Sequence, residues 1–388
     1  MKELSNAARI VQPSPIRKMF NLTGGMDDVV SFTVGEPDFS TPQHIVNSAI
    51  GALERGEHHY TPNAGILPLR QAIAETTERS HSLRYDPEHE IIVTAGGMEA
   101  LMLTMMTLLD PGDEWLLTDP CWTNYSRQIQ LCSAVPRFVP TRAEDGFFFD
   151  PDALEAAITP RTKGFLINSP TNPTGGVAAR KRLEALASIA QRHDLWVISD
   201  EVYRELVYDG EAAASIAALP GMQERTIVVN SFSKAYAMTG WRVGYALGPQ
   251  NVIGNMVKLQ ENVAACVNSS AQYGALTALL GPQDRKNEML QAYAARRTLL
   301  LEEFSKIPGL TVSAPQGTFY LFVDVRAAGM DAERFAMDLL EKERVIVVPG
   351  DAFGESGRHY VRLSFAVSPE TIREGTRRIA RYMQSLGF

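Results

Sequence analysis

The middle of the chain alternates short apolar runs with longer amphipathic stretches. The apolar runs predict strands at residues 90–94, 114–118, 163–167, 195–198 and 226–229. Helical periodicity between them predicts helices over residues 98–109 and 182–192. This alternation is typical of a mainly parallel sheet that is covered on both faces. Since ligands of such sheets bind beyond the carboxyl ends of the strands, we expect the functional residues there.

The C-terminal part follows a different pattern, beginning with a long helix predicted over residues 284–305. After it the pattern predicts a strand at 318–325, a helix at 332–342, strands at 345–348 and 360–365, and a last helix from Pro369. Such an α+β pattern indicates a second, smaller domain. A chain of 388 residues also suits two domains better than one.

Composition and charge argue against several classes of protein. No run of 18 apolar residues occurs, so we expect no membrane span. The first residues lack the apolar stretch of a signal peptide, and we expect a cytoplasmic protein. The net charge of −8 comes without a long basic run, which predicts no nucleic-acid partner. Three cysteines without a Cys-x-x-Cys, and histidines without ligand spacing, predict neither a disulfide scaffold nor a metal site.

The segment at residues 230–244 (NSFSKAYAMTGWRVG) gathers hydrogen-bond donors around one lysine, Lys234. It follows an apolar run, so the lysine should lie inside the protein, where an unpaired charge is unfavourable. A neutral buried amine is useful for forming an imine with an aldehyde cofactor. Arg242 can then bind a phosphate through two hydrogen bonds, helped by Ser231 and Ser233. A lone Ser-x-Ser-Lys is more often a loop cap, but the following Gly-x-Arg-x-Gly favours the cofactor site.

Other turns that contain candidate functional residues follow the remaining predicted strands. They contain the sequences Gly96-Gly97-Met98, Asp119-Pro120-Cys121-Trp122, Asn172-Pro173-Thr174-Gly175 and Ser199-Asp200-Glu201-Val202-Tyr203. Paired glycines before a helix let backbone N–H groups approach an anion. Taken singly, each of these turns has an ordinary structural explanation.

Taken together, these motifs resemble those of the class I/II aminotransferases, which are pyridoxal phosphate (PLP) enzymes of the aspartate aminotransferase fold type. The resemblance runs from about Ser14 to the C-terminus. It implies an α/β, PLP-dependent transferase fold with a large, mainly parallel-sheet domain at 45–283. Residues 1–44 and 284–388 would together form the smaller α+β domain.

The resemblance also implies a role for each motif. The cofactor-binding residues would be Tyr60, Gly97, Met98, Trp122, Asn172, Asp200, Tyr203, Ser231, Ser233, Lys234 and Arg242. Lys234 would hold PLP as an internal aldimine and act as the catalytic base. Asp200 would face the pyridine nitrogen and keep it protonated, which makes the ring an electron sink. Tyr60 would reach the phosphate of a partner subunit, which implies a homodimer with shared active sites.

Substrate binding falls to a second set of residues in the resemblance, namely Gly35, Trp122, Asn172 and Arg362. An α-carboxylate needs a planar, bidentate partner, which the guanidinium of Arg362 provides. The expected reaction moves the amino group of an L-amino acid to a 2-oxo acid. A PLP-dependent carbon–sulfur β-lyase of the same fold is an alternative that shares most of these motifs. A PLP-sensing regulator would need a DNA-binding module, and too few residues precede Gly35 for one.

The position after the paired glycines bears on the substrate side chain. Dicarboxylate-specific relatives often place a lysine there to bind the distal carboxylate, whereas this chain has Met98. The methionine weakens an aspartate assignment and favours apolar or aromatic side chains. Arg17, Asn124 or a residue of the partner chain stays open as a distal donor.

Overall fold

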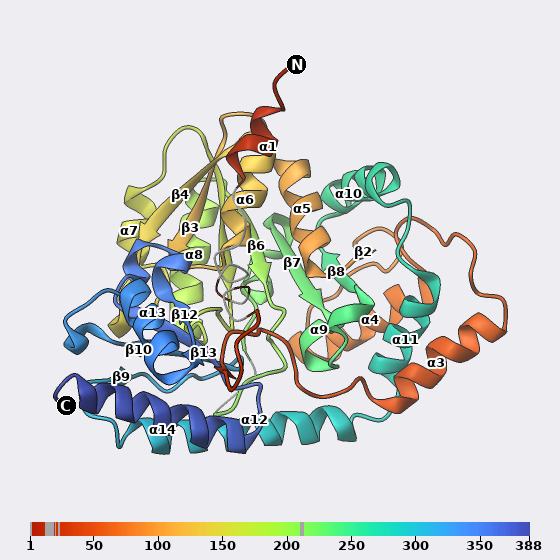
Figure 1. The fold of residues 1–388 in the computed structure, drawn as a ribbon. Coiled ribbons are helices and arrows are strands. Elements are labelled where there is room, and N and C mark those ends of the chain that lie inside the picture. Colours follow the sequence, from red (N-terminus) through yellow and green to blue (C-terminus); the bar gives the residue numbers. More distant parts are fainter. Residues whose placement is uncertain (1, 12–18, 20, 22–23, 210–212) are drawn as a thin grey trace.

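The computed structural model describes residues 2–11, 19, 21, 24–209 and 213–388 (Figure 1). Its largest element is a seven-stranded sheet in the order β2-β8-β7-β6-β5-β3-β4. The strands are β2 (Ile91–Thr94), β3 (Glu114–Asp119), β4 (Val135–Pro140), β5 (Thr162–Asn168), β6 (Trp196–Asp200), β7 (Thr226–Ser231) and β8 (Gly244–Leu247). Neighbours from β7 to β4 pair in parallel, and β8 is antiparallel to both β2 and β7. The predicted mainly parallel sheet is confirmed.

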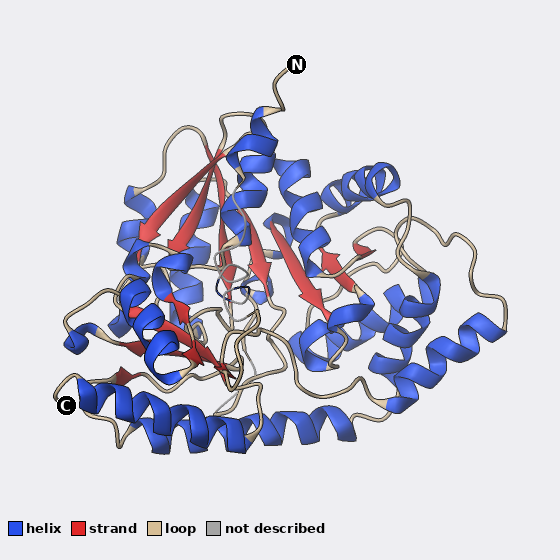
Figure 2. Cartoon of the chain, viewed as in Figure 1, coloured by secondary structure: helices blue, strands red, loops and turns tan. Residues whose placement is uncertain are grey.

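Helices cover both faces of this sheet (Figure 2). The helices of this part of the chain are α3 (Gln43–Glu54), α4 (Leu67–His81), α5 (Gly97–Leu108), α6 (Asn124–Leu131), α7 (Pro151–Ala156), α8 (Arg180–Arg192), α9 (Phe232–Ala235), α10 (Gln250–Val263) and α11 (Ser269–Leu280). Of these, α3 packs against α11. Successive strand residues point to opposite faces. Accordingly Leu117 packs in the core under α5 and α10, whereas its neighbour Leu116 packs in the core under α8. Burial on both faces explains why these strands are apolar throughout.

The C-terminal part forms a four-stranded antiparallel sheet in the order β12-β13-β10-β9. Its elements are α12 (Asp284–Phe304), β9 (Thr311–Val312), β10 (Tyr320–Asp324), α13 (Ala332–Glu343), β12 (Val348–Pro349), β13 (Tyr360–Ser364) and α14 (Pro369–Ser385). Helices α12 and α14 run side by side along the lower edge in Figure 1. The Ser368 hydroxyl caps α14 by accepting from Thr371 N–H at 3.1 Å, and Pro369 occupies the first helical position.

Two predicted strand boundaries in this part are wrong. The expected strand at 345–348 is split, because Val345–Ile346 (β11) pairs in parallel with Val30–Ser31 (β1) while β12 pairs with β13. Strand β10 begins only at Tyr320, since Thr318 has a positive φ of 62°, outside the extended region.

The β1–β11 pair joins the N-terminal segment to the C-terminal part. It supports a discontinuous small domain, and we propose the boundaries 45–283 for the large domain and 1–44 plus 284–388 for the small one. Near the N-terminus, α1 (Asn6–Ile10) lies against α6 of the large domain. Among the described residues, no helix is both long enough and apolar enough to cross a bilayer.

Candidate active site

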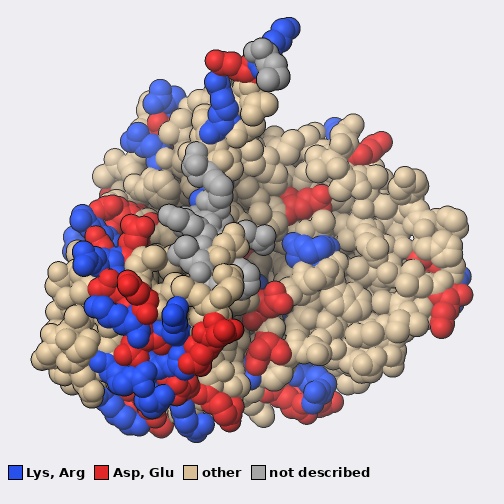
Figure 3. Space-filling view, in the orientation of Figure 1, with Lys and Arg blue, Asp and Glu red and all other residues tan. Residues whose placement is uncertain are grey.

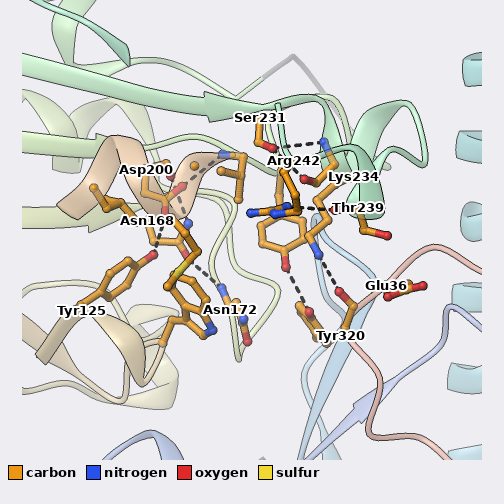
Figure 4. Close-up of a pocket in the computed structure, with 18 of the residues that line it drawn as sticks. Glu36, Tyr125, Asn168, Asn172, Asp200, Ser231, Lys234, Thr239, Arg242 and Tyr320 are labelled. Carbon is orange, nitrogen blue, oxygen red and sulfur yellow. Dashed lines mark hydrogen bonds between the residues drawn. The ribbon is translucent and has the colours of Figure 1, made fainter. Parts of the chain in front are cut away.

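A cavity of about 420 Å³ lies at the carboxyl ends of the central strands. Asn168, Asp200 and Ser231 are the last residues of β5, β6 and β7, and all three line it. Tyr320 and Arg362 reach it from β10 and β13. In Figure 4, Asp200 and Tyr125 lie on one side of this space and Lys234 and Thr239 on the other. Of the predicted site residues, all but Tyr60 line the cavity.

Lys234 lies on the short helix α9, which begins directly after β7. Its Nζ donates a hydrogen bond to the carbonyl oxygen of Gly35 at 2.5 Å. Burial lowers the pKa of Lys234 from an ordinary 10.5 to about 8; the charges of Arg362 and Arg242 also lower it, and that of Glu36 opposes them. A sizeable fraction of the amine is therefore neutral at mildly alkaline pH, which makes it a competent nucleophile and base.

The carboxyl group of Asp200 is 2% exposed and faces the same cavity. Its Oδ2 accepts from the Tyr125 hydroxyl at 2.6 Å, and its Oδ1 accepts from Val202 N–H at 3.3 Å. Burial raises the pKa of Asp200 to about 6, against the opposing effects of these two hydrogen bonds and of the Lys234 charge. A buried carboxylate of this kind is suited to accept a hydrogen bond from a cationic ring N–H.

Arg242 and two serines form one end of the cavity. The Ser231 hydroxyl donates to Ser233 Oγ at 2.8 Å. Arg242 donates to two neutral acceptors, Thr239 O at 2.9 Å and Ala95 O at 3.2 Å. Helix α5 begins next to it at Gly97, so its free N–H groups favour an anion there. Glycine suits the position before the helix, since Gly96 has a positive φ of 78° and a Cβ there would crowd the Arg242 guanidinium.

Arg362 forms the other charged end and is 1% exposed. It donates to Asn172 Oδ1 at 3.0 Å and to Thr33 O at 2.9 Å, and its Nε has no hydrogen-bond partner within the described part of the chain. No carboxylate of the described residues pairs with it. Burial lowers the pKa of Arg362, as expected for a cation whose charge is not compensated. The site therefore favours an anionic ligand at this end.

The remaining predicted residues occupy the cavity walls, with one exception. The Trp122 ring meets Tyr125 edge to face, with centroids 5.3 Å apart. The Tyr203 hydroxyl lies 3.0 Å from that of Tyr320. Met98 is 36% exposed, and its sulfur accepts from Asn124 Nδ2 at 3.4 Å. Tyr60 lies away from the cavity and is 90% exposed. Arg17 falls outside the described residues.

Seven cavity residues lie outside the set of site residues predicted from the sequence, and Tyr125, Asn168 and Tyr320 are three of them. Tyr125 lies one helical turn after Trp122, a spacing that could have indicated a second aromatic residue in the site. Asn168 connects the end of β6 with the turn that follows β5. Its Nδ2 donates to Asp200 O at 3.0 Å, and its Oδ1 accepts from Asn172 N–H at 2.8 Å. Tyr320 lies in an apolar strand pattern that is typical of core residues.

Comparison with known proteins matches the chain to a family. The model of aminotransferase class I and II matches residues 27–379. The chain belongs to this aminotransferase family. The aspartate aminotransferase of Pyrococcus abyssi is 41% identical over 383 residues, covering 98% of each chain. The aromatic-amino-acid aminotransferase 2 of Thermococcus litoralis is 39% identical over 383 residues, again covering 98% of each.

A solved structure extends the likeness to three dimensions. The aspartate aminotransferase from Thermus thermophilus with maleate has a TM-score of 0.93 at 40% identity, covering 98% of this chain and all of that chain. The predicted family, fold and aminotransferase activity are thus confirmed. Relatives of similar identity carry aspartate and aromatic amino acid in their names, so the choice of donor needs a separate argument.

Proposed function

We propose that this aminotransferase binds PLP in the cavity and transfers the amino group of an L-amino acid to a 2-oxo acid. One observation carries the proposal: a single cavity is lined by a buried amine of lowered pKa, a buried carboxylate and two guanidinium groups that pair with no carboxylate of the described residues. The residues fit the cofactor group by group. Lys234 suits the aldehyde, Asp200 the ring nitrogen, and Arg242 with the two serines the phosphate. Bound PLP supplies a sink for the electrons of the substrate Cα–H bond.

The side chains around the cofactor site position the substrate and move one proton. Arg362 binds the α-carboxylate and so fixes the direction of the Cα–H bond. The neutral amine of Lys234 would accept the Cα proton at Nζ and later donate it to the carbon of the cofactor's aldehyde group. Asp200, ionised above a pKa of about 6, would accept a hydrogen bond from a protonated ring nitrogen. Trp122 borders the cavity with a flat aromatic face that suits a planar ring.

Amino-donor profiling with and without a 2-oxo acid tests this function. We expect turnover of an L-amino acid only when a 2-oxo acid is added, since each donor half-reaction must be reversed by an acceptor. Rapid release of thiol from an S-substituted cysteine without any 2-oxo acid would favour the β-lyase alternative instead.

Met98 is proposed to select the donor. Its thioether is apolar and flexible, which suits large neutral side chains. It cannot compensate a distal carboxylate, which is unfavourable to bury unpaired. We therefore expect phenylalanine, tyrosine, leucine or methionine to be better donors than aspartate, and Met98→Lys to shift preference toward aspartate or glutamate. The kcat/KM ratio of phenylalanine to aspartate measures the shift, with Met98→Leu as the neutral control. A wild-type kcat/KM for aspartate far above that of every neutral donor would contradict this role.

Tyr60 is proposed to act across a homodimer interface. It follows α3, and in Figure 3 the surface over α3 and α11 carries few charged side chains. Large apolar side chains are exposed on these helices, including Ile50, Leu53 and Leu280. An exposed apolar surface of this kind is typical of an interface.

Mixing two defective variants tests the shared site. A hybrid dimer of Lys234→Ala and Tyr60→Phe subunits has one site with both Lys234 and Tyr60 intact. We expect the mixture, after subunit exchange, to exceed the weighted mean of the two homodimers. The control is wild type mixed with the double variant Lys234→Ala/Tyr60→Phe, whose hybrids contain no intact site. A chain that sediments as a monomer at micromolar concentration contradicts the proposal.

Tyr125 provides a pH-dependent test of the role of Asp200. Its hydroxyl donates to the ionised carboxylate at 2.6 Å and so lowers the pKa of Asp200. Tyr125→Phe removes that donor, and the pKa of Asp200 should rise. Because the ionised form is the active one, the acid limb of the kcat/KM profile should move to higher pH while the alkaline limb stays in place. An unchanged acid limb would mean that a group other than Asp200 is responsible for the ionisation seen in the profile.

A further inference from the structure

The guanidinium of Arg362 lies over two aromatic rings. Its Cζ is 4.3 Å from the ring centroid of Tyr320 and 4.9 Å from that of Phe353. We propose that these two rings form an aromatic clamp that positions Arg362 and keeps its charge free for the substrate carboxylate. The inference rests on the proposed role of Arg362 and adds Tyr320 and Phe353 as positioning residues.

The polar contacts of Arg362 explain why a clamp is needed. Its hydrogen-bond acceptors among the described residues, Asn172 Oδ1 and Thr33 O, are both neutral, and its Nε has no partner there. A permanent carboxylate partner would stabilise the buried cation but would compete with the substrate. The π face of a ring attracts a cation without neutralising it, and the attraction grows where water is excluded. The rings therefore stabilise the guanidinium and leave it able to bind an anion.

Backbone pairing places Tyr320 against Arg362. In the β10–β13 pair, Tyr320 lies opposite Ser364 and Phe322 lies opposite Arg362. Tyr320 and Arg362 are thus diagonal neighbours on one face of the sheet, within reach of an aromatic ring. The hydroxyl of Tyr320 is fixed in turn by that of Tyr203, 3.0 Å away.

Phe353 is held in place by a backbone contact with the large domain. It ends the short helical turn Gly350–Phe353 and is 2% exposed. Its carbonyl oxygen accepts from Cys121 N–H at 2.9 Å, in the turn that carries Trp122. The clamp therefore joins the carboxylate-binding end of the cavity to the wall that we propose borders the cofactor ring.

Binding of a substrate-like carboxylate to the cofactor-loaded protein tests the clamp. The probe is 3-phenylpropionate or succinate, whichever binds wild type more tightly, measured by isothermal titration calorimetry. Tyr320→Leu and Phe353→Leu retain apolar volume but lose the π face, and each should weaken binding by about tenfold. Tyr320→Phe retains the π face and should restore the affinity to within about threefold of wild type. In steady-state assays the Leu variants should raise KM by a larger factor than they lower kcat.

Arg362→Ala separates failure of the clamp from failure of the proposed function. If Arg362→Ala loses the probe while both Leu variants bind it as wild type does, the clamp is wrong and the role of Arg362 stands. If Arg362→Ala itself binds the probe normally, the proposed role of Arg362 is wrong. Affinity lost equally in Tyr320→Phe and Tyr320→Leu would also overturn the clamp, since the hydroxyl rather than the ring would then matter. Thermal unfolding checks each variant, and where one Leu variant does not fold the other decides.

Discussion

Lys234→Ala is expected to abolish transamination, lowering kcat/KM on the order of 10⁴-fold or more. The substitution removes both the amine that we propose holds the cofactor and the base that moves the Cα proton. Nζ of Lys234 is well placed for both, since it lines the cavity and burial lowers its pKa to about 8. Steady-state assays with the best donor measure the loss. Lys181→Ala, which removes an exposed lysine of α8 outside the cavity, is the matched control.

Borohydride reduction identifies the lysine independently of turnover. The wild-type protein with PLP should be yellow, and reduction should bleach the colour and leave a covalent adduct. Peptide mass spectrometry should place that adduct on Lys234, and Lys234→Ala should remain unlabelled. An adduct trapped on any other lysine would overturn the assignment.

The sequence predicted those parts of the fold and site that are encoded locally. Strands β5, β6 and β7 are buried on both faces and read as apolar runs, and the polar residues that end them converge on one cavity. Lys234 and Arg242 belong to a single short segment, so their spacing in the sequence already indicated that both lie in the same site. The specific role of each residue came from the family resemblance and not from the pattern.

Residues whose role depends on tertiary pairing could not be predicted this way. Arg362 alone looks like a surface-strand arginine, yet the structure buries it to 1% exposure. Tyr320 and Phe353 look like ordinary core aromatics, and their contact with Arg362 arises only when three separate segments pack together. The split of the predicted strand at 345–348 has the same origin, because Val345–Ile346 pairs with β1 near the N-terminus whereas Val348 pairs with β13.

Arg362→Ala is expected to impair substrate use while PLP stays bound. Losing a buried, charge-assisted partner typically costs roughly 2–5 kcal/mol, or about 30- to 5,000-fold in kcat/KM. The loss should be large here because Arg362 is buried and free of carboxylate partners among the described residues. Cofactor absorbance should remain, since the phosphate end of the cavity is built from other residues.

Arg362→Lys distinguishes charge from geometry at this position. Lysine keeps the positive charge but cannot offer the two parallel hydrogen bonds of a guanidinium, so we expect activity between that of wild type and Arg362→Ala. Activity of Arg362→Lys equal to wild type would mean that charge alone suffices. Near-normal kcat/KM in Arg362→Ala with the best donor would mean that another cation anchors the carboxylate. Among the described residues that line the cavity, the remaining guanidinium is that of Arg242. Arg242 would then have to bind the substrate carboxylate, and the cofactor phosphate would have to bind at the Arg362 end.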